Sequence, residues 1–157
     1  GRGGTMRGYT YRDEPGVSVA RARGVEIPMS PKKTYEVLNA IRGLSLDRAR
    51  QVLEDAVALK KAIPFRRYNQ ETAHHRGTGP GRFPRKVAKN VLQVLKNAEQ
   101  NAEYDSLDTD RLYIKIAASS RGRLRKATMP RAQGRATQWN EQTTSVEIVL
   151  AERKEEG

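Results

Sequence analysis

The chain has 157 residues, of which 30 are Lys or Arg and 18 are Asp or Glu, so its formal net charge is +12. Hydrophobic residues make up 36% of it, enough for a single small core, and the absence of cysteine excludes disulfides, thiolate metal sites and cysteine nucleophiles. No stretch approaches the roughly 20 apolar residues needed to span a bilayer. A basic excess of this size is typical of proteins that bind nucleic acid.

The chain begins with a Gly- and Arg-rich segment, residues 1–16, which has little to bury. We expect a flexible basic extension there, and a single domain over residues 17–157. The segment has no apolar run suited to a signal peptide, so a cytoplasmic location is expected. Val17 to Ile27 then has a weak strand pattern, which Gly24 interrupts.

Two helices are predicted next. Ser30 followed by Pro31 is a typical helix start, and the apolar residues after it recur on one face until Gly43. Ser45 starts a second helix, with an apolar stripe of Leu46, Ala49, Val52, Leu53, Ala56 and Val57, and Ile63-Pro64 is expected to end it.

A basic insert over residues 64–83 follows, without any periodicity. A structureless insert of this length is usually functional or disordered, and its basic and aromatic residues favour function. His74 and His75 are adjacent, but no other histidine exists, so an RNA-contacting or solvated pair is favoured over a metal site. The Gly-rich run at residues 77–81 lacks the Lys-Ser/Thr of a phosphate-binding loop.

Pro84 opens a third helix, whose amphipathic face comprises Val87, Ala88, Val91, Leu92, Leu95 and Ala98. The charge changes sign along this part of the chain. Residues 64–89 contain seven bases and one acid, whereas residues 90–110 contain five acids and one lysine. This alternation suggests one side for RNA and another for solvent or a partner, although ordinary solvated helix faces would also explain it. Asp105 to Asp110 is expected to be a polar turn.

Two strands complete the pattern. Leu112 to Ile116 and Val146 to Leu150 both alternate apolar and polar residues, and antiparallel pairing is preferred because no crossover helix lies between them. The nearly thirty intervening residues, extended as a ribbon at ~3.3 Å per residue, would reach on the order of 40 to 50 Å. The sequence therefore predicts an α+β fold with three helices on a small antiparallel sheet, and an extended β-hairpin arm over residues 112–150.

The arm carries a dense group of cations. Residues 111–140 contain eight Lys or Arg and no acid, and six of the eight lie between Arg121 and Arg135. Like charges at this density repel one another unless a polyanion neutralises them. Arginine predominates, and its planar guanidinium favours bidentate contact with phosphate.

These residues resemble a known family. Residues 81–103, GRFPRKVAKNVLQVLKNAEQNAE, and 129–150, MPRAQGRATQWNEQTTSVEIVL, are similar to the two signature stretches of the universal large-subunit ribosomal protein L-twenty-two family. Residues 30–53 are similar to its first two helices, and the insert containing YNQETAHHRGTGPG is similar to the archaeal and eukaryotic branch, whose eukaryotic member is called L-seventeen. The extreme N-terminal residues match no part of the family, and Leu124 to Thr128 are less typical of it.

The resemblance implies a structural role rather than catalysis. Such proteins bind large-subunit ribosomal RNA near the mouth of the polypeptide exit tunnel, and their hairpin lies along the tunnel wall beside a neighbouring ribosomal protein. The implied partners are therefore this RNA, neighbouring ribosomal proteins and the nascent polypeptide, with no cofactor, metal, membrane or homo-oligomer. By match to PRAQGRA, the residues at the exit-tunnel tip are Lys126, Ala127, Thr128, Met129, Pro130, Arg131 and Ala132.

Candidate RNA-binding residues follow from the basic clusters. In the body they are Lys32, Lys33, Arg66, Arg67, His74, His75, Arg76, Arg82, Arg85 and Lys86. In the arm they are Arg121, Arg123, Arg125, Lys126, Arg131 and Arg135. Two alternatives remain: a free-standing RNA chaperone or regulator, and an RNA-acting enzyme that uses His74 and His75 as its acid-base pair.

Overall fold

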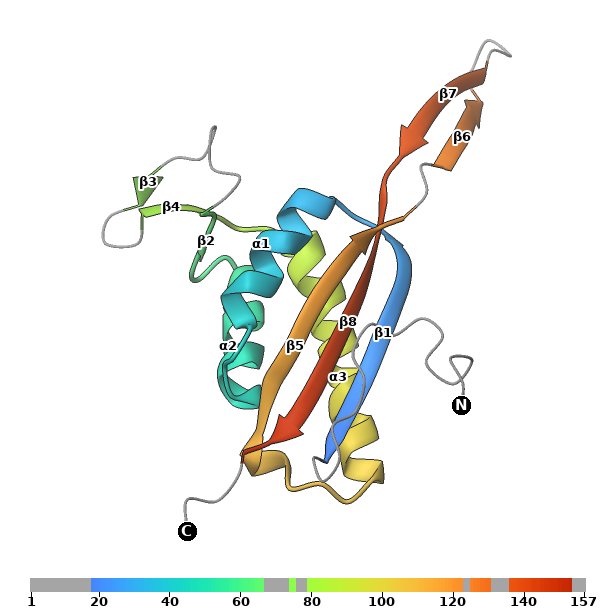
Figure 1. Ribbon diagram of the computed structural model, residues 1–157. Coiled ribbons are helices and arrows are strands. Elements are labelled where there is room, and N and C mark those ends of the chain that lie inside the picture. Colours follow the sequence, from blue (N-terminus) through green and yellow to red (C-terminus); the bar gives the residue numbers. More distant parts are fainter. Residues whose placement is uncertain (1–17, 67–73, 76–78, 123–124, 131–135, 154–157) are drawn as a thin grey trace.

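The computed structural model describes residues 18–66, 74–75, 79–122, 125–130 and 136–153 (Figure 1). Three helices pack against one face of a three-stranded antiparallel sheet, as the sequence predicts. The helices are α1 (Pro31–Ile41), α2 (Leu46–Val57) and α3 (Arg85–Tyr104). The strands are β1 (Val19–Pro28), β5 (Leu112–Arg121) and β8 (Thr143–Glu152).

The central strand of this sheet is β8, which pairs antiparallel with β1 on one side and with β5 on the other. Ile148 lies opposite Ala22 of β1 and Ala117 of β5, and all three residues belong to the hydrophobic core. The predicted antiparallel pairing of the last two strands is therefore confirmed, and both strands are longer than their alternating centres. A 3-10 turn, η2 (Thr109–Arg111), lies between α3 and β5 in the predicted polar turn.

Both predicted helix starts have the expected side-chain caps. The hydroxyl of Ser30 accepts a hydrogen bond from the amide of Lys33, and that of Ser45 accepts one from the amide of Arg48, each at 3.3 Å. Gly43 ends the first of these helices with a φ of 84°, a conformation that glycine adopts without strain.

The expected end of the second helix is wrong. Helix α2 ends at Val57 rather than at Ile63. Leu59 has a φ of 61°, and the amide of Lys60 donates to the carbonyl oxygen of Asp55 at 2.8 Å. The apolar stripe also ends at Val57, because the following Leu59 is exposed to solvent. The chain therefore leaves the helix six residues before the proline.

Gly24 does not interrupt β1 but lies where the strand bulges. The register of β1 against β8 shifts between Gly24 and Ile27. A β-carbon at Gly24 would lie 2.6 Å from Cδ1 of Ile27 and 3.0 Å from Cγ2 of Val94, so a larger residue here would require these side chains to shift. The amide of Glu26, in the same bulge, donates to the hydroxyl of Ser145 at 2.9 Å.

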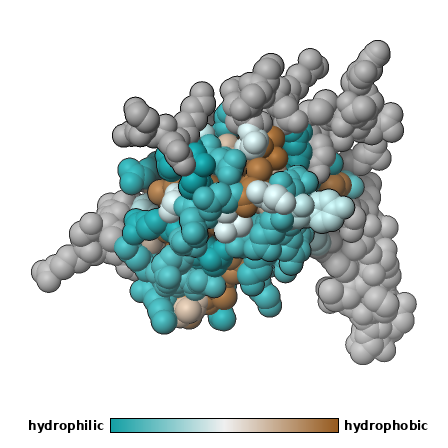
Figure 2. All heavy atoms as spheres, turned by 90° about the horizontal axis from the view of Figure 1, so that it is seen from below, coloured by the Kyte–Doolittle hydropathy of each residue, from teal (hydrophilic) through white to brown (hydrophobic). Residues whose placement is uncertain are grey.

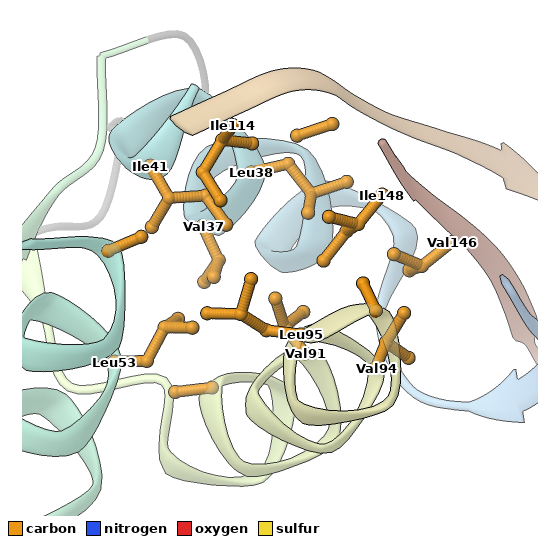
Figure 3. Packing of buried hydrophobic residues seen from close by; sticks show 14 of the residues in the cluster. Val37, Leu38, Ile41, Leu53, Val91, Val94, Leu95, Ile114, Val146 and Ile148 are labelled. Atoms are coloured by element: carbon orange, nitrogen blue, oxygen red, sulfur yellow. The ribbon is translucent and has the colours of Figure 1, made fainter. Parts of the chain in front are cut away.

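The core lies between the three helices and the sheet (Figure 3). The close-up shows apolar side chains of every helix meeting those of β5 and β8: Val37, Leu38, Ile41, Leu53, Val91, Val94, Leu95, Ile114, Val146 and Ile148. On α3 the buried face includes Val94, which the sequence analysis omitted, while the predicted Leu92 is only partly buried.

Part of the basic insert forms a second small sheet, in contrast to the expected lack of structure. Its strands are β2 (Ile63–Pro64), β3 (His74–His75) and β4 (Gly79–Arg82), in the order β2-β4-β3. Gly81 lies opposite Pro64, and a β-carbon there would lie 3.2 Å from the carbonyl oxygen of Ile63. These short strands pair through backbone hydrogen bonds, and the sequence has no alternating apolar pattern from which they could be predicted.

The arm continues the hairpin of β5 and β8. Strands β6 (Arg125–Pro130) and β7 (Ala136–Glu141) pair antiparallel and project beyond the body (Figure 1). At the base of the arm, Arg121 pairs with Thr144 and Arg125 pairs with Glu141. The first side of the hairpin advances four residues between these two pairs and the second side three, so the two sides differ by one residue. The predicted extended hairpin thus has described strands at both its base and its outer part.

Candidate nucleic-acid interface

The first turns of α1 and α3 carry cations instead of acids. Exposed Lys32 and Lys33 follow Pro31 at the start of α1, and exposed Arg85 and Lys86 begin α3. Neither helix has an acidic residue in its first turn, whereas α2 has Asp47 there. The positive end of the helix dipole disfavours cations, so these two starts are electrostatically unfavourable without an anion.

The positions of these helix starts make one basic end of the body. Figure 1 shows that α1 and α3 both begin at the end from which the arm projects. Arg121, the last residue of β5, is exposed at the same end. The structure therefore brings together the predicted cations of both helices and the base of the arm.

Residues of the insert extend this basic end to one side of α1. The amide of Arg66 donates to Oε1 of Glu36 at 3.1 Å, which ties the start of the insert to α1. The side chain of Arg66 is exposed to solvent. The guanidinium carbon of Arg82 lies 5.4 Å from the ring centroid of Phe65, which is buried. The guanidinium of Arg85 donates from Nε to the carbonyl oxygen of Val57 at 2.9 Å.

Other predicted residues of the insert are placed by backbone only or lie outside the described residues. His74 pairs with Pro80 and His75 with Gly79 in the small sheet. Arg67 and Arg76 lie outside the described residues.

Two of the predicted cations of the arm lie on its paired outer strands. Arg125 pairs with Glu141 and Lys126 with Asn140, both on the outer ladder. Of the predicted tip residues, Lys126 to Pro130 lie in β6. Arg123, Arg131, Ala132 and Arg135 lie outside the described residues.

The opposite end of the body is acidic. It contains the C-terminal half of α3 and the turn that follows, with Glu99, Glu103, Asp105, Asp108 and Asp110. Figure 2, which views the molecule from this end, shows a mainly hydrophilic described surface with small hydrophobic patches. The acids of α3 and η2 thus gather away from the two basic helix starts, as the charge pattern suggests, but Arg111 of η2 and the neighbouring Arg153 lie among them.

One acid of this end forms an internal ion pair. Glu99 Oε1 accepts from Nη2 of Arg50 at 2.6 Å and joins α3 to α2. Burial lowers the pKa of Arg50, but the hydrogen bond and charge of Glu99 outweigh it, so the pKa lies above its ordinary value. Arg50 therefore has a structural partner.

Two further arginines also have structural roles. Nη2 of Arg42 donates to the carbonyl oxygen of Ala117 at 2.6 Å, on the edge strand β5. The guanidinium of Arg153 lies 4.5 Å from the ring centroid of Tyr113 and donates to the carbonyl oxygen of Gly43 at 3.2 Å. Sequence alone does not separate such cations from those that are exposed for a partner.

Two exposed cations near Arg66 were missed by the sequence analysis. Arg48 of α2 and Lys61, which precedes β2, line the same pocket as Arg66. Arg48 lies among the mixed charges of α2, and Lys61 lies just before the predicted insert, so neither falls within a predicted basic cluster. Only the packing of α2 against α1 reveals this grouping.

The described residues offer little else that suggests chemistry. Among them, no group of three His, Asp or Glu side chains could hold a metal ion. In the same part of the chain, no helix is both long and apolar enough to cross a membrane.

Comparison with known proteins agrees with this arrangement. The family model described as "Ribosomal protein L22p/L17e" matches residues 22–151. Among similar proteins, each named "Large ribosomal subunit protein uL22", that of Methanothrix thermoacetophila is 48% identical over 150 residues, covering 94% of this chain and 99% of the relative. That of Archaeoglobus fulgidus is 46% identical over 148 residues, covering 92% and 96%.

A third relative with the same name, from Methanopyrus kandleri, is 47% identical over 132 residues and covers 82% of this chain and 83% of its own length. These archaeal relatives confirm the predicted branch, and they are ribosomal proteins rather than enzymes. The family match spans all three helices and most of the sheet, and it includes both strands of the arm. The chain therefore belongs to the ribosomal protein L22p/L17e family.

Proposed function

We propose that this protein is a structural constituent of the large ribosomal subunit, that it binds large-subunit ribosomal RNA through the basic end of its body and its arm, and that the arm lines the polypeptide exit tunnel. Its partners are then this RNA, neighbouring ribosomal proteins and the nascent chain. The body and arm act as one RNA-binding domain.

The observation that carries this proposal is the placement of cations in the first turns of α1 and α3. Phosphate groups at these helix starts would be favoured by the positive ends of the two helix dipoles and by the lysine and arginine side chains. Such contacts fix the orientation of a protein on RNA without reading its sequence. The same end of the body carries the arm, so RNA bound there would hold the arm in a fixed direction.

The arm supports the second part of the proposal. Its outer strands are paired with each other and project away from the core. The positive charges of this region would be neutralised by surrounding phosphate groups. A narrow two-stranded ribbon is stable only marginally by itself. Packing between RNA segments would supply the missing contacts, and the turn of the ribbon would then face the space enclosed by RNA.

Sedimentation tests the proposal. The tagged chain is expressed in cells, and the lysate is separated on a sucrose gradient before and after a high-salt wash. We expect the chain to remain with the large subunit after the wash, because a protein held by RNA contacts on several of its faces dissociates slowly from the assembled particle. A free-standing RNA chaperone would sediment near the top of the gradient or be removed by salt, and either result would contradict the structural role.

A further inference from the structure

A pocket of about 480 Å³ lies between α1, α2 and the segment that enters β2. Residues three or four positions apart on each helix face it, including Glu36 and Ala40 of α1 and Arg48 and Val52 of α2. Lys61 and Arg66 contribute from the third side. The volume is within the range of ~300–1,000 Å³ that is typical of small-molecule sites.

The most buried polar group of the pocket is a carboxylate. Glu36 is 1% exposed, and its Oε1 accepts the hydrogen bond from the amide of Arg66 at 3.1 Å. An ionised carboxylate has about four lone-pair sites and accepts hydrogen bonds only. A ligand in this pocket would therefore present hydrogen-bond donors to Glu36.

The rim of the pocket has the opposite character. Arg48, Lys61 and Arg66 are exposed there, and none of them forms an ion pair with another described residue. Ala40 and Val52 supply apolar surface to the lining. The pocket lining thus combines exposed cations, apolar surface and a buried acceptor.

We propose that this pocket holds a single unstacked nucleotide of the bound RNA, with its phosphate on the rim cations and the exocyclic amino group of its base donating to Glu36. The inference rests on the proposed function, since it names an RNA contact of the same basic surface. Unpaired bases in RNA loops and bulges are commonly recognised in this way, through contact with their faces and hydrogen bonds to their edges.

The charges of the pocket favour a nucleotide over a basic peptide. The carboxylates of Glu36 and Asp55 line it, but the three cations outnumber them. A lysine or arginine side chain entering the pocket would pass these cations before it reached Glu36. A nucleotide meets both groups with matching chemistry, because its phosphate is anionic and three of the four RNA bases carry an amino group.

A titration of the isotope-labelled full chain by nuclear magnetic resonance tests the proposal, with AMP, CMP, GMP, UMP and ribose 5-phosphate as probes. We expect AMP, CMP and GMP to shift the amide signals of Glu36, Ala40 and Val52. UMP lacks an amino group, and its ring N3–H lies between two carbonyl oxygens that an ionised carboxylate repels. It is therefore expected to bind about tenfold more weakly, the factor that corresponds to one hydrogen bond with a charged acceptor. Ribose 5-phosphate should bind more weakly still.

Variants separate the two parts of the pocket. Glu36→Gln keeps the side-chain size and should remove the discrimination against UMP, provided that its thermal unfolding matches that of the parent. Arg48→Ala and Lys61→Ala leave the buried core untouched and should each weaken all nucleotides several-fold, because each removes one phosphate contact. Lys89→Ala and Lys96→Ala, on the exposed face of α3 and outside the pocket, should change nothing.

Several results would overturn the inference. If UMP and ribose 5-phosphate shift the pocket signals as strongly as AMP, CMP and GMP do, the pocket binds phosphate without recognising a base. Shifts of the pocket signals by an arginine-rich peptide, with the nucleotides silent, would assign the pocket to a protein partner. If the chain sediments with the large subunit while the pocket stays silent, only this inference fails. If the nucleotides bind while the chain stays off the large subunit, the proposed function fails instead.

Discussion

A β-carbon added at Gly122 would lie 1.9 Å from Oγ1 of Thr143, while the amide of Gly122 donates to the carbonyl oxygen of Thr143 at 2.7 Å. The two residues meet where β5 ends and β8 begins, at the base of the arm. Thr143 is buried, so its hydroxyl has little room to move away. The absence of a side chain at Gly122 therefore allows the two strands to approach each other at this point.

Replacing Gly122 by Ala should lower the free energy of unfolding by ~1–3 kcal/mol, the usual cost of forcing an extra carbon into a packed site. Urea denaturation of the full chain measures this effect. Ser120→Ala, a change of similar size at an exposed residue of β5, is the matched control and should cost little. In the double variant with Thr143→Ala the added carbon no longer meets the hydroxyl, so part of the loss should be recovered. Strictly additive losses would argue against this contact.

The ion pair of Arg50 and Glu99 offers a test of how α2 is fixed to α3. The two side chains are 28% and 22% exposed, and their closest atoms are 2.6 Å apart. A double-mutant cycle with Arg50→Ala and Glu99→Ala should give a coupling energy on the order of 1 kcal/mol, near the upper end for partly exposed pairs. The coupling should decrease in high salt.

Asp47 provides an internal comparison for the same arginine. It lies 3.3 Å from Nη1 of Arg50 but is 83% exposed. The cycle with Asp47→Ala should therefore give a coupling near zero, and equal couplings for the two acids would contradict the assignment of Glu99 as the main partner. Because the pKa of Arg50 is raised, its charge is lost only at pH values above the ordinary pKa of arginine, and its contribution to stability should not change across neutral pH.

The core makes a simple prediction on α3. Leu95 is 1% exposed, whereas Leu92 on the same helix is only partly buried. Leu95→Ala should destabilise the protein by ~2–5 kcal/mol, and Leu92→Ala by less than half as much, as measured by chemical denaturation. Similar losses for the two leucines would mean that the helix presents a different face to the sheet.

Local chemistry explains which parts of the fold could be predicted from the sequence. The hydroxyls of Ser30 and Ser45 each accept a hydrogen bond from the amide three residues later, so their roles as caps can be predicted from a few neighbouring residues. The apolar stripes of the helices and the alternation in β5 and β8 similarly repeat at the spacing of the element. These features defined the three helices and the antiparallel pair.

The remaining features depend on contacts between distant residues. In the small sheet of the insert the Gly81 backbone lies close to Ile63, a contact between distant residues that leaves no periodic pattern in the sequence. The end of α2 depends on the positive φ of Leu59. Among the cations, Arg42 and Arg153 bind backbone carbonyl groups of the body, while Arg48 joins Arg66 at one pocket, and both facts require the packed structure.

The helix starts should contribute measurably to RNA binding. If Lys32, Lys33, Arg85 and Lys86 each contact a phosphate, replacing all four by Ala should flatten the plot of log K against log salt concentration by about three units, at roughly 0.7 to 0.9 units per contact. Filter binding of the full chain to a large-subunit RNA fragment measures this slope. The double variant Lys89→Ala and Lys96→Ala shows the background effect of removing exposed positive charge from α3. An equal change per charge in both variants would mean that the helix starts have no special role.

The arm can be shortened without disturbing the strands that hold it. Thr128 pairs with Gln138 and Met129 with Thr137, so deleting these four residues together removes two rungs of the ladder. The remaining residues keep their faces, because the side chains of a strand alternate with a period of two. The arm becomes shorter by about 7 Å. If its end lines the exit tunnel, large subunits should still incorporate the variant, since every predicted body cation and the base of the arm are unchanged. Crosslinks from a photoreactive nascent chain to the arm should move to other chain positions or disappear.

The matched control is the parent chain with Thr128→Ser and Thr137→Ser, which keeps the arm at full length. Normal incorporation with an unchanged crosslink pattern would place the end of the arm away from the tunnel, whereas failed incorporation would make the arm's length a requirement for assembly.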